Sequence, residues 1–165
     1  MNEPIQIAAG RALVERGLTV STAESCTGGL VAARLVDYPG ISACLGEAHV
    51  TYANEAKVRY CGVSPETLRL HGAVSPETAR EMAEGLRQKS GADIAAATTG
   101  IAGPGGGTPE KPVGLVYVCV AAPCGTRVEK LNLPGDRGEV RSQAADHVLG
   151  MILEAALKCD KKVQK

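Results

Sequence analysis

The 165-residue sequence contains no tryptophan and no phenylalanine, and tyrosine is present only four times. A core without large aromatic rings must be built from alanine, valine, leucine and isoleucine, which fill space only if helices approach a sheet closely. The 20 glycines are compatible with such close backbone approaches. The composition therefore indicates a tightly packed globular domain of ordinary size.

The sequence also lacks an excess of either charge, because 18 basic residues balance 18 acidic ones. This balance argues against a nucleic-acid partner, whereas a small phosphorylated ligand needs only a few local donors. No segment approaches the roughly 20 apolar residues of a membrane span. The first residues carry early acids and lack the pattern of a signal peptide, so we expect a cytoplasmic protein without membrane association.

Metal chemistry has little support in the sequence. The three histidines are scattered, and the six cysteines contain no C-x-x-C pair. We therefore expect neither a metal nor a cofactor. In the cytosol the cysteines should be reduced and should serve as small buried apolar residues: Cys26, Cys44, Cys61, Cys119, Cys124 and Cys159.

Hydrophobic periodicity and turn residues predict one domain over residues 1–165. Helices are expected over 5–16, over 26–36 and over 54–62, the last with Asn54 as its N-cap. Further helices are expected to begin at the two "SPET" segments, at Ser64 and Ser75, and at Asp136. Strands are expected over 18–24, 46–53, 92–99, 114–122 and 126–133, the last two as a hairpin. This order predicts a three-layer α/β/α sandwich with a mixed, mainly parallel sheet and one antiparallel strand.

Three loops that follow strands carry most of the polar chemistry. They are "ESCTGG" (24–29), "NEAK" (54–57) and the glycine-rich "TTGIAGPGGG" (98–107). Ligands bind beyond the carboxyl ends of parallel strands, so these loops can form one pocket. Backbone N–H groups after Ser25 could stabilise an anion or a developing oxyanion. The alternative is an ordinary helix start, for which serine, threonine and glycine are common.

Lys57 lies close to the start of its predicted helix, where the helix dipole disfavours a cation. A lysine in a dry pocket can lose its proton and act as a base, but this requires a lowered pKa. Tyr52 could relay a proton or hold Lys57 in place. The alternative is an exposed surface lysine. Cys26 could be a nucleophile, although no histidine lies near it in sequence.

"GDRGEVR" (135–141) opens the last predicted helix with two arginines one turn apart. Arg137 and Arg141 could bind a phosphate or carboxylate, or could pair with Glu139 and other surface acids. Walker, G-x-S-x-G and S-x-x-K motifs are absent.

Taken in order, "TAESCTGG", "VTYANEAK", "HGAVSPETA", "GIAGPGGGTPEKPVG" and "GDRGEVR" make the chain similar to the CinA C-terminal domain family over residues 5–157. The resemblance implies a three-layer fold, a homodimer, and hydrolysis of the carboxamide of nicotinamide mononucleotide (NMN) to nicotinate mononucleotide and ammonia. It also implies that Ser25 is the nucleophile and Lys57 the base, with Tyr52 beside them. Many relatives carry an additional N-terminal domain, and an activity linked to that domain is not expected here. The predicted substrate contacts are Glu24, Cys26, Thr27, Gly28, Asn54, Thr99, Gly100, Gly103, Arg137 and Arg141.

Two other functions remain open from the sequence. One is a non-catalytic nucleotide-binding or protein-interaction module of the competence and DNA-damage type. The other is a thiol-dependent amidase that uses Cys26 as the nucleophile.

Overall fold

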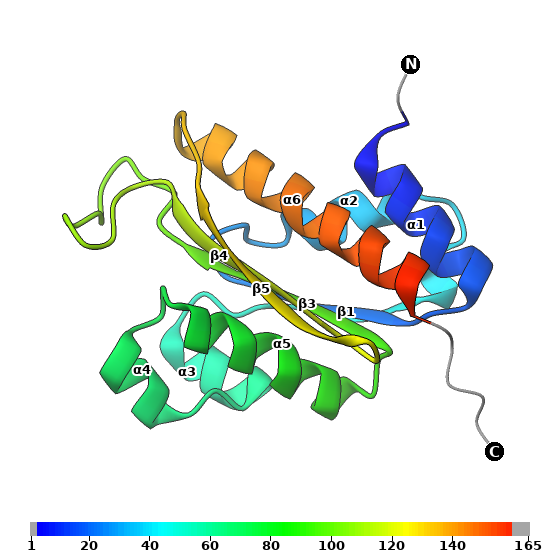
Figure 1. The fold of residues 1–165 in the computed structure, drawn as a ribbon, viewed down its shortest axis with the longest axis horizontal. Helices are drawn as coiled ribbons and strands as arrows, with labels where there is room; N and C mark the ends of the chain where they lie inside the picture. The colour runs from blue at the N-terminus through cyan, green and yellow to red at the C-terminus, as the bar shows by residue number, and fades with distance from the viewer. Residues whose placement is uncertain (1–2, 160–165) are drawn as a thin grey trace.

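The computed structural model describes residues 3–159, which form a mixed five-stranded sheet between two layers of helices (Figure 1). The strand order is β2-β1-β3-β4-β5, and β4 is antiparallel to its two neighbours while β2, β1 and β3 run parallel. The predicted sandwich with one antiparallel strand is therefore confirmed. The strands are β1 (Val20–Glu24), β2 (Leu45–Val50), β3 (Ile94–Gly100), β4 (Leu115–Ala122) and β5 (Gly125–Asn132).

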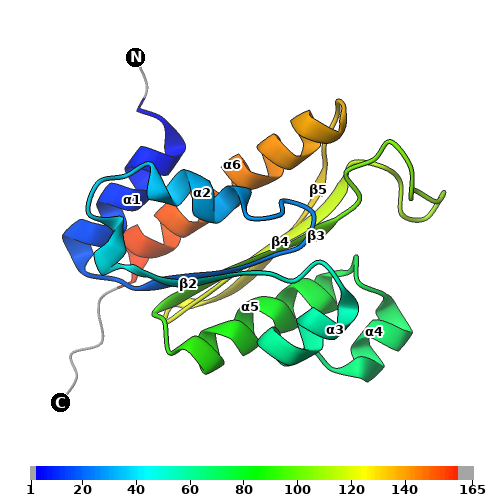
Figure 2. The same cartoon turned by 180° about the vertical axis from the view of Figure 1, so that it is seen from behind.

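Helices cover both faces of the sheet (Figures 1 and 2). The first layer holds α1 (Ile5–Arg16), α2 (Leu30–Val36) and α6 (Arg137–Lys158), and the short 3-10 turn η1 (Ile41–Ala43) leads from α2 into β2. The second layer holds α3 (Asn54–Ala56), the π-helical turn η2 (Lys57–Cys61), α4 (Pro65–His71) and α5 (Pro76–Ser90). No helix between residues 3 and 159 is long and apolar enough to cross a bilayer.

The core is aliphatic, as the composition predicts. The cluster beneath α5 is built largely from small side chains, with Ala79 and Ala83 of α5 packed together with Ala95 and Ala97 of β3. Small residues on both surfaces let the helix lie close to the sheet, which fills the space without aromatic rings. The cluster beneath α1 and α6 is larger, and its branched side chains from these helices include Leu13, Val140, Val148, Leu149 and Ile152.

The two "SPET" segments begin helices as predicted. The Ser64 hydroxyl accepts from the Glu66 N–H at 3.2 Å, and the Ser75 hydroxyl accepts from the Thr78 N–H at 3.1 Å. Asp136 caps α6 and forms a reciprocal capping box with Glu139. Side-chain caps of this kind depend on local sequence, which is why the pattern alone located them.

Two predicted helices differ from the structure. The helix predicted over 26–36 begins only at Leu30, because residues 25–29 form a turn in which Gly28 and Gly29 have positive φ angles of 61° and 99°. The helix predicted over 54–62 is split into α3 and the π-helical turn η2, and its N-cap is Ala53 rather than Asn54. A π-helical turn holds one residue more than an α-helical turn, and here both Lys57 and Cys61 are buried.

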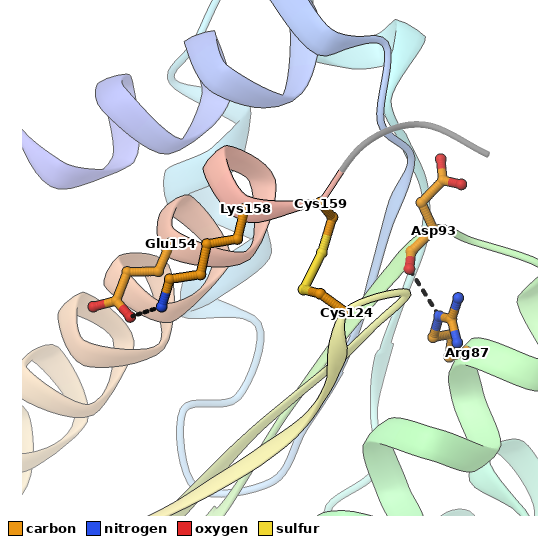
Figure 3. Close-up of a disulfide and its surroundings, with 6 residues drawn as sticks. All are labelled: Arg87, Asp93, Cys124, Glu154, Lys158 and Cys159. Atoms are coloured by element: carbon orange, nitrogen blue, oxygen red, sulfur yellow. Dashed lines mark hydrogen bonds and ion pairs between the residues drawn. A yellow bond between two sulfur atoms is a disulfide. The ribbon is translucent and has the colours of Figure 1, made fainter. Parts of the chain in front are cut away.

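The expectation that all six cysteines are reduced is wrong for one pair. Cys124, in the β4–β5 hairpin, is joined to Cys159 at the end of α6 by a disulfide (Figure 3). The two residues are 35 positions apart, so only the packing of α6 against the hairpin brings them together. The other four cysteines are buried, as predicted.

Candidate active site

The ends of three parallel strands meet around Ser25. The Ser25 N–H donates to the Thr98 carbonyl at the end of β3, at 3.0 Å, and the Thr51 N–H after β2 donates to the Glu24 carbonyl at 2.8 Å. The register of β1 against both neighbours therefore continues for one residue beyond the strand ends. This arrangement brings the segment after β2, which contains Lys57, next to the residue that follows β1.

Lys57 is buried, with 1 % of its surface exposed, and its amino group lies 3.1 Å from the Ser25 hydroxyl oxygen. The same nitrogen donates to the carbonyl oxygens of Thr51 and Tyr52 at 2.8 and 3.2 Å. No carboxylate forms an ion pair with Lys57 anywhere in residues 3–159. Burial without a negative partner lowers the pKa of Lys57 from its ordinary value.

The Lys57 nitrogen has three oxygen partners, which match the three donors of a charged ammonium and can equally surround a neutral amine. A neutral amine has two N–H donors and one lone pair, and carbonyl oxygens can only accept hydrogen bonds. The Thr51 and Tyr52 carbonyls therefore use both N–H groups. In the neutral form the remaining lone pair would face the Ser25 hydroxyl, which would then donate its proton along that 3.1 Å contact. The geometry is that of a general base next to a nucleophile.

Glu24 is fully engaged within the turn that carries Ser25. Its carboxylate accepts from the Thr27 hydroxyl at 2.5 Å, and from the N–H groups of Gly29, Val31 and Ala32 at 3.1, 3.0 and 2.9 Å. The negative charge at the start of α2 is therefore supplied by the protein's own Glu24 carboxylate. Sequence patterns gave no indication of this capping role, because it needs a glutamate that precedes the helix by six residues and folds back onto it.

Two backbone donors of the turn that follows Ser25 have no oxygen acceptor among the described residues. The Gly28 N–H donates to the Ser25 carbonyl at 3.1 Å, and the Gly29 N–H donates to Glu24. For Cys26 and Thr27, the described residues provide no oxygen acceptor to the backbone N–H. These two amides belong to buried residues that directly follow Ser25, which makes them candidate donors to a ligand atom at Ser25.

The Cys26 side chain is poorly suited to act as a nucleophile. It is buried, and burial raises the pKa of its thiol to about 11. A thiol with this pKa is almost entirely protonated at neutral pH, whereas the thiolate is the reactive form. The structure thus places the hydroxyl of Ser25 in contact with the Lys57 amino group.

Arg137 and Arg141, at the start of α6, reach the site from the opposite helical layer. Arg137 donates to the Gly103 carbonyl at 2.8 Å and to the Tyr52 hydroxyl at 3.0 Å. Arg141 donates to the carbonyls of Cys26 and Thr27 at 3.1 and 2.9 Å. Arg137 thereby links the glycine-rich loop to the segment before Lys57, while Arg141 contacts the turn of Ser25.

The remaining predicted residues lie around this centre with differing exposure. The buried Thr99 hydroxyl donates to the Ala73 carbonyl at 2.7 Å, and Gly100 lies against Leu115 and Val116 of β4. Asn54 is exposed at the start of α3, and Tyr52 is 59 % exposed. Sequence analysis missed Thr51, whose carbonyl binds Lys57, since a main-chain acceptor has no residue signature. Within residues 3–159, no group of three His, Cys, Asp or Glu side chains is placed to hold a metal.

Comparison with known proteins gives a consistent family assignment. Residues 2–156 match the CinA C-terminal domain. A competence-damage inducible protein of Symbiobacterium thermophilum is 56 % identical over 159 residues, which cover 91 % of this chain and 37 % of that protein. Another, from Clostridium acetobutylicum, is 54 % identical over 143 residues, covering 87 % of this chain and 35 % of that protein. The chain spans about a third of the length of these curated relatives.

Solved structures share the fold over nearly the whole chain. The competence/damage inducible protein CihA of Agrobacterium tumefaciens has a TM-score of 0.88 and 42 % identity, covering 94 % of this chain and 97 % of that one. A CinA superfamily protein from Klebsiella pneumoniae has a TM-score of 0.88 and 35 % identity with the same coverage.

Proposed function

We propose that this chain, which belongs to the CinA C-terminal domain family, is an amidohydrolase that converts NMN to nicotinate mononucleotide and ammonia. The observation that carries the proposal is the contact between the buried amine of Lys57 and the Ser25 hydroxyl, at 3.1 Å. Two carbonyls occupy the other donors of the amine, so its lone pair is directed at the proton that must be removed.

The first half of the reaction forms an acyl-enzyme. Lys57 takes the proton of the Ser25 hydroxyl while the oxygen attacks the carboxamide carbon of NMN. The negative charge that develops on the carboxamide oxygen is stabilised by the backbone N–H groups of Cys26 and Thr27. Lys57 then gives its proton to the departing nitrogen, the C–N bond breaks, and ammonia leaves.

The second half uses water in place of serine. Neutral Lys57 takes a proton from a water molecule, which attacks the ester carbon and regenerates the same oxyanion. When the ester bond breaks, the proton returns from Lys57 to the Ser25 oxygen. Nicotinate mononucleotide leaves, and the enzyme is restored without a net change in protons on either residue.

The phosphate of NMN is a binding group that lies remote from the reacting amide. Arg137, whose guanidinium binds the exposed Tyr52 hydroxyl, is the proposed phosphate ligand. Asn54, Thr99, Gly100 and Gly103 line the proposed path between the phosphate and the carboxamide. Binding energy from a remote group can be used to accelerate the distant reaction. Nicotinamide, which lacks the ribose phosphate, should therefore be a poor substrate.

The test is an ammonia-release assay with NMN and, in parallel, with nicotinamide. The wild-type protein should form nicotinate mononucleotide and ammonia in equal amounts from NMN, and far less ammonia from nicotinamide. Ser25→Ala, prepared identically, controls for contaminating amidases. Saturable NMN binding without ammonia release would instead indicate a nucleotide-binding module, and equal release by Ser25→Ala would remove Ser25 as the nucleophile.

A further inference from the structure

We infer that Arg141 is a positioning residue that orients the amide donors beside Ser25, and is not a ligand of the substrate phosphate. This inference rests on the proposed function, because it assigns a role within the same reaction. It departs from the sequence prediction, in which both arginines at the start of α6 were substrate contacts.

The contacts of Arg141 are directed at the backbone of the turn. Its Nε donates to the Cys26 carbonyl at 3.1 Å, and its Nη2 donates to the Thr27 carbonyl at 2.9 Å. A guanidinium has its donors in a rigid planar fork, so two consecutive carbonyls held together are fixed in direction as well as position. The guanidinium also lies against Gly28, where an added Cβ atom would be 3.5 Å from Nη2.

Fixing a carbonyl also fixes the N–H of the same peptide group. In a trans peptide the C=O and N–H bonds point in opposite directions, and the Cys26–Thr27 bond is trans. With the Cys26 carbonyl held by Arg141, the Thr27 N–H must point away from the guanidinium. This is one of the two turn amides without an oxygen acceptor among the described residues.

Arg141 and Glu24 divide the polar groups of the turn between them. Glu24 binds the N–H groups of Gly29, Val31 and Ala32, and Arg141 binds the carbonyls of Cys26 and Thr27. The two side chains approach from different elements, β1 and α6. Together they leave the Cys26 and Thr27 amides without an oxygen acceptor within residues 3–159, directly after Ser25 in the chain, where the proposed reaction develops negative charge. Without Arg141, the peptide group after Cys26 would lose the one hydrogen bond that its carbonyl makes in the described part of the chain, while the Thr27 hydroxyl and the Gly28 N–H would still hold the turn on either side.

The decisive experiment compares kcat and KM for Arg141→Met and Arg141→Lys with NMN. If Arg141 orients the oxyanion donors, both variants should lose about 10²-fold to 10³-fold in kcat, as for loss of one oxyanion donor, with little change in KM. Lysine keeps the charge but has no planar fork, so it should not restore kcat. Arg80→Met, which alters an exposed ion pair on α5, is the matched control and should behave as wild type.

A phosphate ligand would give the opposite pattern. KM for NMN would rise, kcat would be retained, and Arg141→Lys would recover part of the affinity; this result overturns the inference. Variants that match wild type in both constants also overturn it. Nicotinamide riboside, which is NMN without its phosphate, gives an independent arm, because a positioning role predicts the same fractional loss with either substrate.

Amide hydrogen exchange separates failure of this inference from failure of the proposed function. In wild type the Gly28 N–H, which is bonded to the Ser25 carbonyl, should be protected from exchange. In Arg141→Met the protection of Gly28 should fall by about tenfold or more as the turn opens. Unchanged protection contradicts the positioning role even if the wild-type protein releases no ammonia from NMN.

Discussion

Gly85, in the middle of α5, lies directly against the carbonyl group of Cys61, the last residue of the π-helical turn that begins with Lys57. A Cβ atom on Gly85 would overlap the Cys61 carbonyl oxygen and would lie 2.9 Å from the carbonyl carbon. The Cys61 carbonyl is part of the backbone and Gly85 lies inside α5, so moving either group away would cost free energy. The absence of a side chain at Gly85 therefore determines how deeply the turn of Lys57 is seated against α5.

Gly85→Ala should reduce both stability and activity. In a helix interior, alanine normally stabilises the fold by about 1 kcal/mol relative to glycine. A loss of stability in Gly85→Ala would therefore reflect the steric clash. We expect a net loss of about 2 kcal/mol in the free energy of unfolding, together with a lower kcat because Lys57 is displaced from Ser25. Urea unfolding and NMN turnover measure the two effects.

Gly46→Ala is the matched control for this substitution. Gly46 lies in β2 with open space around the position of its Cβ, so its unfolding free energy should change by less than about 0.5 kcal/mol. A Gly85→Ala protein as stable and as active as Gly46→Ala would show that the turn of Lys57 does not depend on this contact.

The lowered pKa of Lys57 makes stability depend on pH. The unfolded lysine binds its proton with the ordinary pKa of 10.5, and the folded one binds it less tightly. Between the folded pKa and 10.5 the unfolded state holds more protons, so rising pH favours the folded state in this window. The unfolding free energy of wild type, relative to Lys57→Met, should therefore increase as pH rises through this window. A difference that is flat or falls with pH would mean that the folded pKa is not lowered.

Cys26→Ala should retain activity. The pKa of about 11 leaves the thiol protonated at neutral pH, and the substitution keeps the backbone N–H that the mechanism uses. We expect kcat within about fivefold of wild type and a modest loss of stability from the missing sulfur atom. The thiol-dependent alternative predicts the reverse: an inactive Cys26→Ala, and inactivation of wild type by a thiol reagent that NMN prevents.

The Cys124–Cys159 disulfide should stabilise the fold without affecting catalysis. The two cysteines are 35 positions apart in the sequence. Closing a loop of this length lowers the entropy of the unfolded chain, which should stabilise the folded state by about 4 kcal/mol. The double variant Cys124→Ser/Cys159→Ser should lose up to about this amount in urea unfolding. Its kcat at 25 °C should be unchanged, because the disulfide lies at the end of α6 opposite to Arg137 and Arg141 (Figure 3). Equal stability of oxidised wild type and the double variant would contradict this prediction.

Local signals predicted more of the fold than of the site. Pro and Ser at each "SPET" and Asp136 before α6 act within one helical turn, so the sequence locates them directly. The three loops could be placed together because parallel strands share one carboxyl edge. The roles of Ser25 and Lys57 came from family resemblance, and the structure then brought the two side chains into contact.

The remaining features depend on packing between distant segments. The π-helical turn of Lys57 lies against Gly85, and the carbonyl partners of Arg141 lie more than a hundred residues away in sequence. Neither relationship has a local pattern. The same holds for Cys124 and Cys159, which only the seating of α6 on the β4–β5 hairpin brings together.

The most direct test of the account is a double-mutant cycle on NMN deamidation with Ser25→Ala, Lys57→Met and the combined variant. If Lys57 acts by removing the proton of Ser25, each single variant should lose about 10³-fold or more in kcat. The kcat of the double variant should then be no lower than that of the less active single variant. A Ser25→Ala protein within about tenfold of wild type, or losses that multiply in the double variant, would show that the two residues do not act as one nucleophile–base pair.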